Sequence, residues 1–168
     1  MTVFPSLARF LRRRRIPRRL IAPAGTCDAA LAAAAAALPR ETGGILFGYR
    51  AGDDVVIERT LEIPDSAATA SSYRRDHAMA QRVLERQLES TSPHLGYVGE
   101  WHSHPAPAGA SGQDVREIAA ISKLSANPIA LLVLRRDARD RWGLHAWIAT
   151  GGVADQVELI DTDNSRAT

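Results

Sequence analysis

Residues 100–114 limit the possible folds of this chain more than any other stretch, because they place metal-ligand residue types at close spacing. His102 and His104 are separated by one residue. If residues 95–104 form a strand, alternate side chains share a face, so both imidazoles point the same way. Asp114 would return to that face through a loop. Three protein ligands with a fourth position left for water are typical of a catalytic zinc site.

Parts of this stretch also have simpler explanations. Two histidines separated by one residue occur by chance on surface strands. Ser111 and Asp114 have the spacing of a helix capping box, with Ser111 as the N-cap. This cap is compatible with metal binding, because a capped first turn would hold the Asp114 carboxylate at a fixed angle. We therefore expect His102, His104 and Asp114 to bind one Zn²⁺ per chain.

A carboxylate far upstream completes the expected site. Residues 41–48 read Glu-Thr-Gly-Gly-Ile-Leu-Phe-Gly, and Glu41 follows the end of a predicted helix. A zinc-bound water needs a general base, and a carboxylate that is not itself a ligand suits this role. We expect the remaining histidines, His77, His94 and His145, to lie outside the site.

These segments together resemble the motif of the JAMM (MPN-plus) zinc metalloproteases. The resemblance rests on Glu41 with the glycine pair after it, the segment His-Ser-His-Pro from His102, and Ser111-x-x-Asp114, and it covers about residues 28–150. The segments Tyr-Arg-Arg-Asp at 73–76 and Gly-Glu-Trp-His at 99–102 are similar to the bacterial Prok-JAB branch. That branch is found near ubiquitin-like, E1-like and E2-like proteins in defence and mobile-element operons.

The resemblance implies an α/β fold, with one JAMM/MPN-like domain and a curved mixed β-sheet flanked by helices, as in the cytidine-deaminase-like architecture. A chain of 168 residues with 45% hydrophobic residues suits one domain with a real core. The apolar pattern predicts helices over residues 29–38, 76–90 and 115–124, and strands over residues 44–49, 55–59, 61–64, 95–104, 129–134 and 142–149. Asp28 is the expected N-cap of the first helix. Residues 21–25 could be an edge strand or a loop, and residues 153–160 a strand or a helix.

The resemblance also implies the chemistry. Zn²⁺ would lower the pKa of its water to about 7. Glu41 would take the proton and deliver it to the leaving amine, and Ser111 would donate a hydrogen bond to the developing oxyanion. The implied reaction is amide or isopeptide hydrolysis after the C-terminus of a ubiquitin-like protein. It would remove that protein from targets or process its precursor, in a bacterial antiphage or mobile-element operon with E1-like and E2-like proteins as candidate partners.

Other functions stay open at this point. A related peptidase could act on a sulfur-carrier protein or a peptide, and family members without the zinc motif are non-catalytic scaffolds. All five site positions are intact, which favours an enzyme. An extended substrate tail could add a strand beside the site. Gly43 and Gly44 would then allow the substrate backbone to approach closely. Alternatively, the two glycines merely relieve packing. No motif indicates an oligomeric state.

The N-terminal segment differs in charge from the rest. Residues 1–20 hold seven of the 21 basic side chains and no acid, which leaves 14 basic against 19 acidic side chains elsewhere. We expect a basic arm over residues 1–22, a domain over 23–160 and a disordered tail over 161–168. A short helix over residues 6–15 of the arm is an open alternative. Such an arm could bind nucleic acid, lipid or an acidic protein, or could be a solvated extension. A nucleic-acid binder is the weaker hypothesis.

Cysteine content and hydropathy bear on the compartment. Cys27 is the only cysteine, so neither an intramolecular disulfide nor a zinc-binding cysteine cluster can form, as suits a reducing cytoplasm. Pro17 and Pro23 interrupt the segment that could act as a signal peptide, and cleavage after Ala37 would separate Glu41 from its supporting helix. No run of about 18 apolar residues predicts a transmembrane helix. We therefore expect a cytoplasmic protein without a membrane partner.

Overall fold

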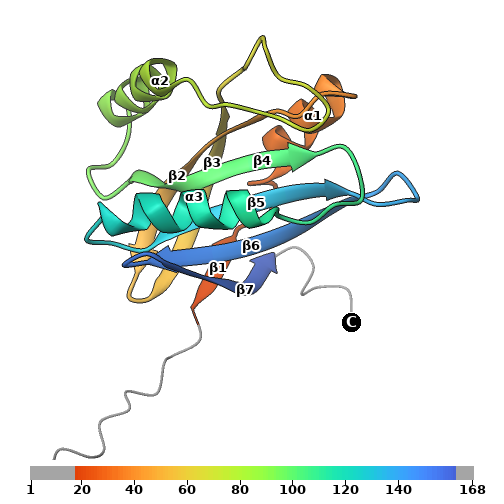
Figure 1. Cartoon of the computed structure of the whole chain (residues 1–168). Helices are drawn as coiled ribbons and strands as arrows, with labels where there is room; N and C mark the ends of the chain where they lie inside the picture. Colours follow the sequence, from red (N-terminus) through yellow and green to blue (C-terminus); the bar gives the residue numbers. More distant parts are fainter. Residues whose placement is uncertain (1–17, 162–168) are drawn as a thin grey trace, which may run out of the picture.

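The computed structural model describes residues 18–161 (Figure 1). This part of the chain has three helices, α1 (Asp28–Ala37), α2 (His77–Glu89) and α3 (Gly112–Lys123), and seven strands, β1 (Arg19–Ala22), β2 (Gly43–Ala51), β3 (Asp54–Glu62), β4 (Gly96–His104), β5 (Ile129–Arg136), β6 (Trp142–Thr150) and β7 (Val153–Asp161). The helix considered for residues 6–15 lies outside the described residues. Of the tail predicted over residues 161–168, Asp161 is the last residue of β7, and residues 162–168 lie outside the described residues. The two strands predicted over 55–59 and 61–64 are one strand, β3, and residues 153–160 belong to a strand.

The strands form a closed barrel in the order β1-β3-β2-β4-β5-β6-β7, and β7 pairs back to β1. The pairs β4–β5, β1–β3 and β1–β7 are parallel, and the other pairs are antiparallel. The expected α/β fold with a mixed sheet is confirmed. The sheet differs from the expected curved sheet flanked by helices, because it closes into a barrel. It closes because the first strand, β1, pairs with the last strand, β7.

Closure depends on β1, which lies within the segment assigned from sequence to the basic arm. Residues 20–21 pair with residues 55–56 of β3, and residues 19–22 pair with residues 158–161 of β7. Leu20 is fully buried. The sheet therefore begins four residues before the predicted start of the domain, and β1 is a strand paired on both sides, not an edge strand or a loop.

Two N-terminal deletions should separate the arm from the barrel. Deleting residues 1–16 removes no described strand, so the melting temperature should stay near that of the full-length protein. Deleting residues 1–22 removes β1 and the buried Leu20, and the loss of one buried leucine alone costs about 2–5 kcal/mol. Thermal unfolding measured by circular dichroism compares the two. If the longer deletion melted like the shorter one, β1 would not hold the barrel closed.

The three helices pack on different parts of the barrel (Figure 1). α1 places Ala30 and Ala34 in the main apolar cluster, which takes residues from every strand. α3 packs Ile118 against β5 and β6, and α2 packs Ala80 against the region of Ile45 at the start of β2. Among residues 18–161, none of the helices has the length and apolar character needed to cross a membrane.

The start of α1 differs from the prediction by one residue. Cys27 is the N-cap and makes no side-chain capping hydrogen bond, whereas Asp28 is the first helical residue. A carboxylate in the first turn is still favourable there, because the N-terminal end of a helix dipole is positive. The alanine-rich composition has the expected consequence, since Ala30 and Ala34 are almost completely buried and let the helix approach the barrel closely.

Candidate metal centre

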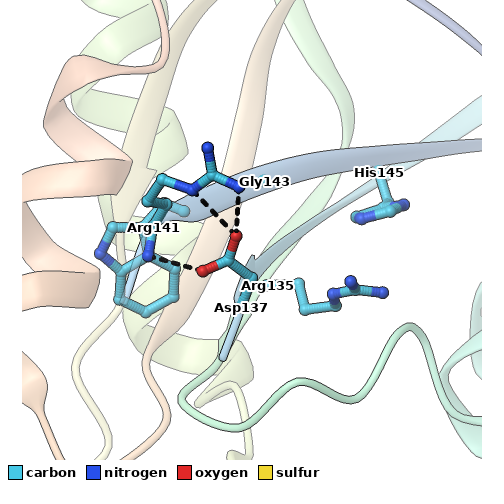
Figure 2. A pocket seen from close by; sticks show the side chains of 6 residues that line it. Arg135, Asp137, Arg141, Gly143 and His145 are labelled. Atoms are coloured by element: carbon cyan, nitrogen blue, oxygen red, sulfur yellow. Dashed lines mark hydrogen bonds and ion pairs between the residues drawn. The ribbon is translucent and has the colours of Figure 1, made fainter. Parts of the chain in front are cut away.

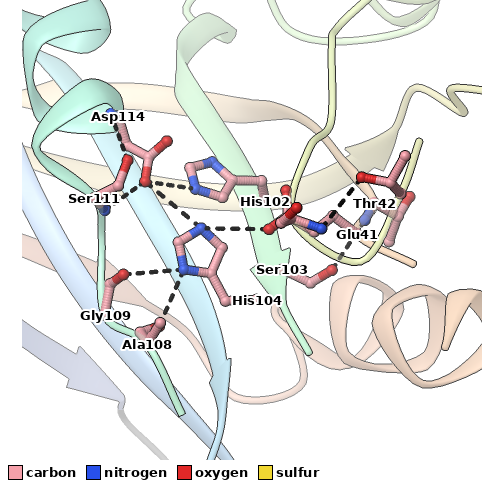
Figure 3. A network of polar contacts seen from close by, with 11 residues as sticks. Glu41, Thr42, His102, Ser103, His104, Ala108, Gly109, Ser111 and Asp114 are labelled. Carbon is pink, nitrogen blue, oxygen red and sulfur yellow. Dashed lines mark hydrogen bonds and ion pairs between the residues drawn. The ribbon is translucent and has the colours of Figure 1, made fainter. Parts of the chain in front are cut away.

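The C-terminal end of β4 carries the two histidines of the predicted site (Figure 3). His102 and His104 project from the same face, and their ring centroids are 4.9 Å apart. Ser103, between them, is fully buried on the other face. This alternation is what the sequence predicts for a strand, and it brings both imidazoles to one side of the sheet.

The backbone around His104 sets the orientation of its ring. Its Nδ1 atom lies 3.0 Å from the carbonyl oxygens of both Ala108 and Gly109. Because a carbonyl oxygen only accepts hydrogen bonds, Nδ1 is the donor in these contacts, and Nε2 is the ring nitrogen left to bind a metal. The Nε2 atom faces the site, 3.5 Å from Oδ2 of Asp114. A ligating histidine in a metal site is commonly held by such a bond to its other nitrogen.

Asp114 enters the site from the first turn of α3. Ser111 is the N-cap, its hydroxyl oxygen accepts from the Asp114 amide at 3.2 Å, and the Ser111 amide donates to Oδ2 of Asp114 at 2.6 Å. The predicted capping box is therefore confirmed. Burial opposes ionisation of the Asp114 carboxyl, but the contact with His102 and the hydrogen bonds from Ser111 outweigh it and hold its pKa well below the ordinary value.

The donor set and its spacing fit a zinc ion. The candidate ligand atoms of His102, His104 and Asp114 all lie within 4.8 Å of one another. The Nε2 atom of each imidazole is 3.5 Å from Oδ2 of Asp114, close to the roughly 3.3 Å that separates ligands about 2.0–2.1 Å from a tetrahedral zinc. The Nε2 atom of His102 is buried and has no hydrogen-bond partner, which a metal would supply. Three protein ligands also leave a position open for catalysis.

Glu41 lies beside this group, just before β2. Its Oε1 atom is 4.0 Å from Nε2 of His104, and its side chain is 11% exposed. Burial raises the pKa of this carboxyl above its ordinary value, His104 and His102 reduce that rise, and the charge of Asp114 adds to it. Glu41 therefore lies where the sequence predicts it, next to the three candidate ligands. Its carboxylate is farther from His104 than the Asp114 carboxylate is.

Backbone contacts that the sequence analysis missed hold Glu41 in place. The Glu41 amide donates to the carbonyl of Thr69 at 2.7 Å. The next amide, of Thr42, donates to the buried hydroxyl of Ser103 at 3.0 Å, and the Ser103 amide donates back to the Thr42 carbonyl at 2.8 Å. The strand pattern places Ser103 on the core face, and a buried hydroxyl needs a hydrogen-bond partner. Of these contacts, only that of Ser103 could therefore be expected from the sequence.

The Ser111 hydroxyl is engaged with Asp114. Its oxygen accepts from the Asp114 amide in the capping box, and its side chain also hydrogen-bonds the Asp114 carboxylate. The residue is exposed and lies beside Asp114 (Figure 3). Both features are compatible with the expected contact to an oxyanion.

The glycine pair after Glu41 serves packing at Gly43. A Cβ atom at Gly43 would lie 2.6 Å from the Trp101 carbonyl oxygen, 2.6 Å from Cε1 of Tyr73 and 2.9 Å from Cβ of His102. The space beside Gly43 is therefore filled by Tyr73 and is not available to a substrate. Of the two explanations open at the sequence level, relief of packing holds at this position.

Strand addition beside β4 is also ruled out. β4 pairs with β2 on one side, through Gly43–Gly48, and with β5 on the other, through Ala130–Arg135. Both rows of backbone donors and acceptors are therefore occupied. An extended substrate therefore cannot add a strand to β4 itself.

The other histidines lie outside the metal centre. His145 lines a pocket of about 280 Å³ at the end of the β5–β6 hairpin, together with Arg135 and Asp137. Figure 2 shows these side chains. The Asp137 carboxylate accepts hydrogen bonds from Arg141 and is not turned toward His145. His77 starts α2, and His94 is exposed in the turn before β4. Among the described residues, the candidate metal group consists of His102, His104 and Asp114.

Comparison with known proteins agrees with this geometry. Residues 23–157 match the family described as prokaryotic homologs of the JAB domain (Prok-JAB). The chain is 30% identical over 121 residues to a protein named CD-NTase/cGAS isopeptidase from Enterobacter hormaechei subsp. hoffmannii (strain UCI 50). That alignment covers 68% of this chain and 66% of the relative, just under two thirds of the relative's length.

A solved structure supports the fold. The chain is similar to the solution structure of protein DSY2949 from Desulfitobacterium hafniense, with a TM-score of 0.62 and 22% sequence identity. The superposition covers 85% of this chain and 92% of that one. The family match over residues 23–157, together with the group formed by His102, His104 and Asp114, shows that this chain belongs to the prokaryotic JAB-domain family.

Proposed function

We propose that this protein is a zinc-dependent isopeptidase that hydrolyses the bond after the C-terminus of a ubiquitin-like protein. The observation that carries the proposal is the convergence of His102, His104 and Asp114, with Glu41 beside them, on one face of the barrel. The name of the Enterobacter relative, CD-NTase/cGAS isopeptidase, supports the isopeptide bond as the substrate class.

The three ligand residues would hold Zn²⁺ through Nε2 of each imidazole and the Asp114 carboxylate. Bound zinc would supply a water of lowered pKa and polarise the scissile carbonyl. The hydrogen bonds from Nδ1 of His104 to the carbonyls of Ala108 and Gly109 orient the ring so that Nε2 faces the ligand position. The contact with His102 and the capping-box hydrogen bonds favour the ionised Asp114 carboxylate, and the capping box fixes its direction. The ligand set is thus organised by the chain itself.

Glu41 would act as the general base and then as the general acid. Its raised pKa suits this double role, because a higher pKa makes the carboxylate a stronger base toward the water proton that it then gives to the leaving lysine amine. Ser111 would donate its hydroxyl proton to the carbonyl oxygen as negative charge develops there. A comparable donor in other hydrolases contributes about 3–4 kcal/mol. The reaction forms no covalent intermediate with the protein.

Cleavage of defined conjugates tests the proposal. Purified zinc-loaded protein would be offered a ubiquitin-like protein with a C-terminal extension, and the same protein joined through an isopeptide bond to a lysine, including a lysine of a CD-NTase. Mass spectrometry should show a cut directly after the C-terminal residue of the ubiquitin-like protein, and a chelator should stop it. Fusions of a sulfur-carrier protein test the competing substrate class. If the zinc-loaded protein left the conjugate and the extended ubiquitin-like protein intact, the proposed function would be wrong, whether or not it cut the sulfur-carrier fusions.

A further inference from the structure

The segment between β3 and α2, which we call the 65–76 loop, contacts the candidate site at several points. It is held internally, since Asp65 accepts hydrogen bonds from the amides of Ala67 and Arg74 at 2.9 Å each. It also carries the Thr69 carbonyl, which accepts from the Glu41 amide at 2.7 Å. The position of Glu41 therefore depends on a loop that is remote from it in sequence.

The end of this loop is fixed to the strand that carries the two histidines. Nη2 of Arg75 lies 2.8 Å from Oε1 of Glu100, and the hydroxyl of Tyr97 donates to the same oxygen at 3.1 Å. Glu100 precedes His102 by two residues in β4, so the two side chains share a face of the sheet. The ion pair thus joins the 65–76 loop to the face that holds the metal ligands.

Tyr73 makes a third contact between the loop and the site. Its hydroxyl donates to the Ile63 carbonyl at 2.9 Å, and its ring fills the space beside Gly43, next to Cβ of His102. The loop is therefore attached near the site at three residues, Thr69, Tyr73 and Arg75.

The energetics of such an ion pair indicate a role in geometry more than in stability. The side chains of Arg75 and Glu100 are only 17% and 20% exposed, so most of their hydration is lost. Desolvation of that kind offsets much of the attraction between buried charges, and a buried ion pair is weak evidence for added stability. Nε of Arg75 is also buried without a hydrogen-bond partner, which lowers the net gain further.

We propose that Arg75 is a positioning residue for Glu41: its ion pair with Glu100 fixes the 65–76 loop, and the Thr69 carbonyl of that loop fixes the Glu41 backbone. The inference deepens the proposed function, since it assumes that Glu41 is the base. It gives a role to Arg75 and Glu100, whose side chains have no part in the expected chemistry at the metal.

Amide hydrogen exchange in the zinc-loaded full-length protein tests the proposal without a substrate. Arg75→Gln should raise the exchange rate of the Glu41 amide by at least about tenfold, the change expected when one charged hydrogen bond that closes the loop is lost. Arg74→Gln is the matched control, because it removes the same charge from an exposed neighbour in the same loop whose backbone amide contact with Asp65 stays. Its Glu41 amide should exchange at the wild-type rate.

Further readouts separate positioning from a general loss of stability. Zinc content should be unchanged in Arg75→Gln, and on a conjugate that the wild type cleaves, kcat should fall without a rise in KM. Arg75→Lys keeps the positive charge and should give a smaller exchange effect, and it serves as the test if Arg75→Gln does not fold. Equal Glu41 exchange in the Arg75 variants and in Arg74→Gln would overturn the proposal. Because exchange is read without substrate, this result is independent of whether the proposed isopeptidase activity is found.

Discussion

Replacing Glu41 with glutamine is expected to lower turnover by about 10²- to 10⁴-fold, with zinc content and melting temperature close to wild type. Glutamine keeps the shape of the side chain and its capacity for hydrogen bonds, but it cannot accept the proton. The carboxylate lies 4.0 Å from Nε2 of His104 and is mostly buried, and burial raises its pKa toward the range useful to a base. A loss confined to turnover therefore identifies a base and not a ligand.

The experiment needs three measurements on one preparation: zinc by elemental analysis, binding of the ubiquitin-like conjugate, and cleavage. Glu58→Gln is a suitable control, because it makes the same chemical change at an exposed position of β3. Its turnover should equal that of the wild type. If Glu41→Gln kept more than about a tenth of the activity, Glu41 would not be the base. If it lost the zinc, Glu41 would be a ligand.

Replacing His102 with alanine should abolish zinc binding and hydrolysis together. The Nε2 atom of His102 is buried without a hydrogen-bond partner and lies 3.5 Å from Oδ2 of Asp114, so its removal takes away one of three ligands. The two remaining ligands cannot complete the site of a tightly bound zinc. Elemental analysis should give about one zinc per wild-type chain, as expected from a single three-ligand group, and close to none in the variant.

Thermal unfolding gives a second readout that does not depend on substrate. A ligand present at about 1,000 times its Kd stabilises the folded state by about 4 kcal/mol, so a chelator should lower the melting temperature of the wild type. The same chelator should leave the melting temperature of His102→Ala unchanged. His94→Ala, an exposed histidine before β4, should behave like the wild type in both tests. A His102→Ala protein that still held a full equivalent of zinc would show that the ligand set is wrong.

The sequence determined the features that depend on local periodicity and on residue chemistry. The alternation in β4 placed His102 and His104 on one face, and the spacing of Ser111 and Asp114 specified the capped start of α3. Helices and strands were found close to their predicted ranges, because a period of 3.6 or 2 in apolar residues follows from the geometry of each element. The same residues pointed to the JAB-domain family before any fold was known.

Only the tertiary structure decided which segments lie next to one another. β1 has four residues, too few for a period-two pattern to be read, yet it closes the barrel between β3 and β7. The bond from the Glu41 amide to Thr69, the ion pair of Arg75 with Glu100, and the packing of Tyr73 on Gly43 join segments far apart in the chain. An alternating pattern fixes which face a side chain occupies, but the neighbour across that face depends on strand order and register, which long-range packing sets.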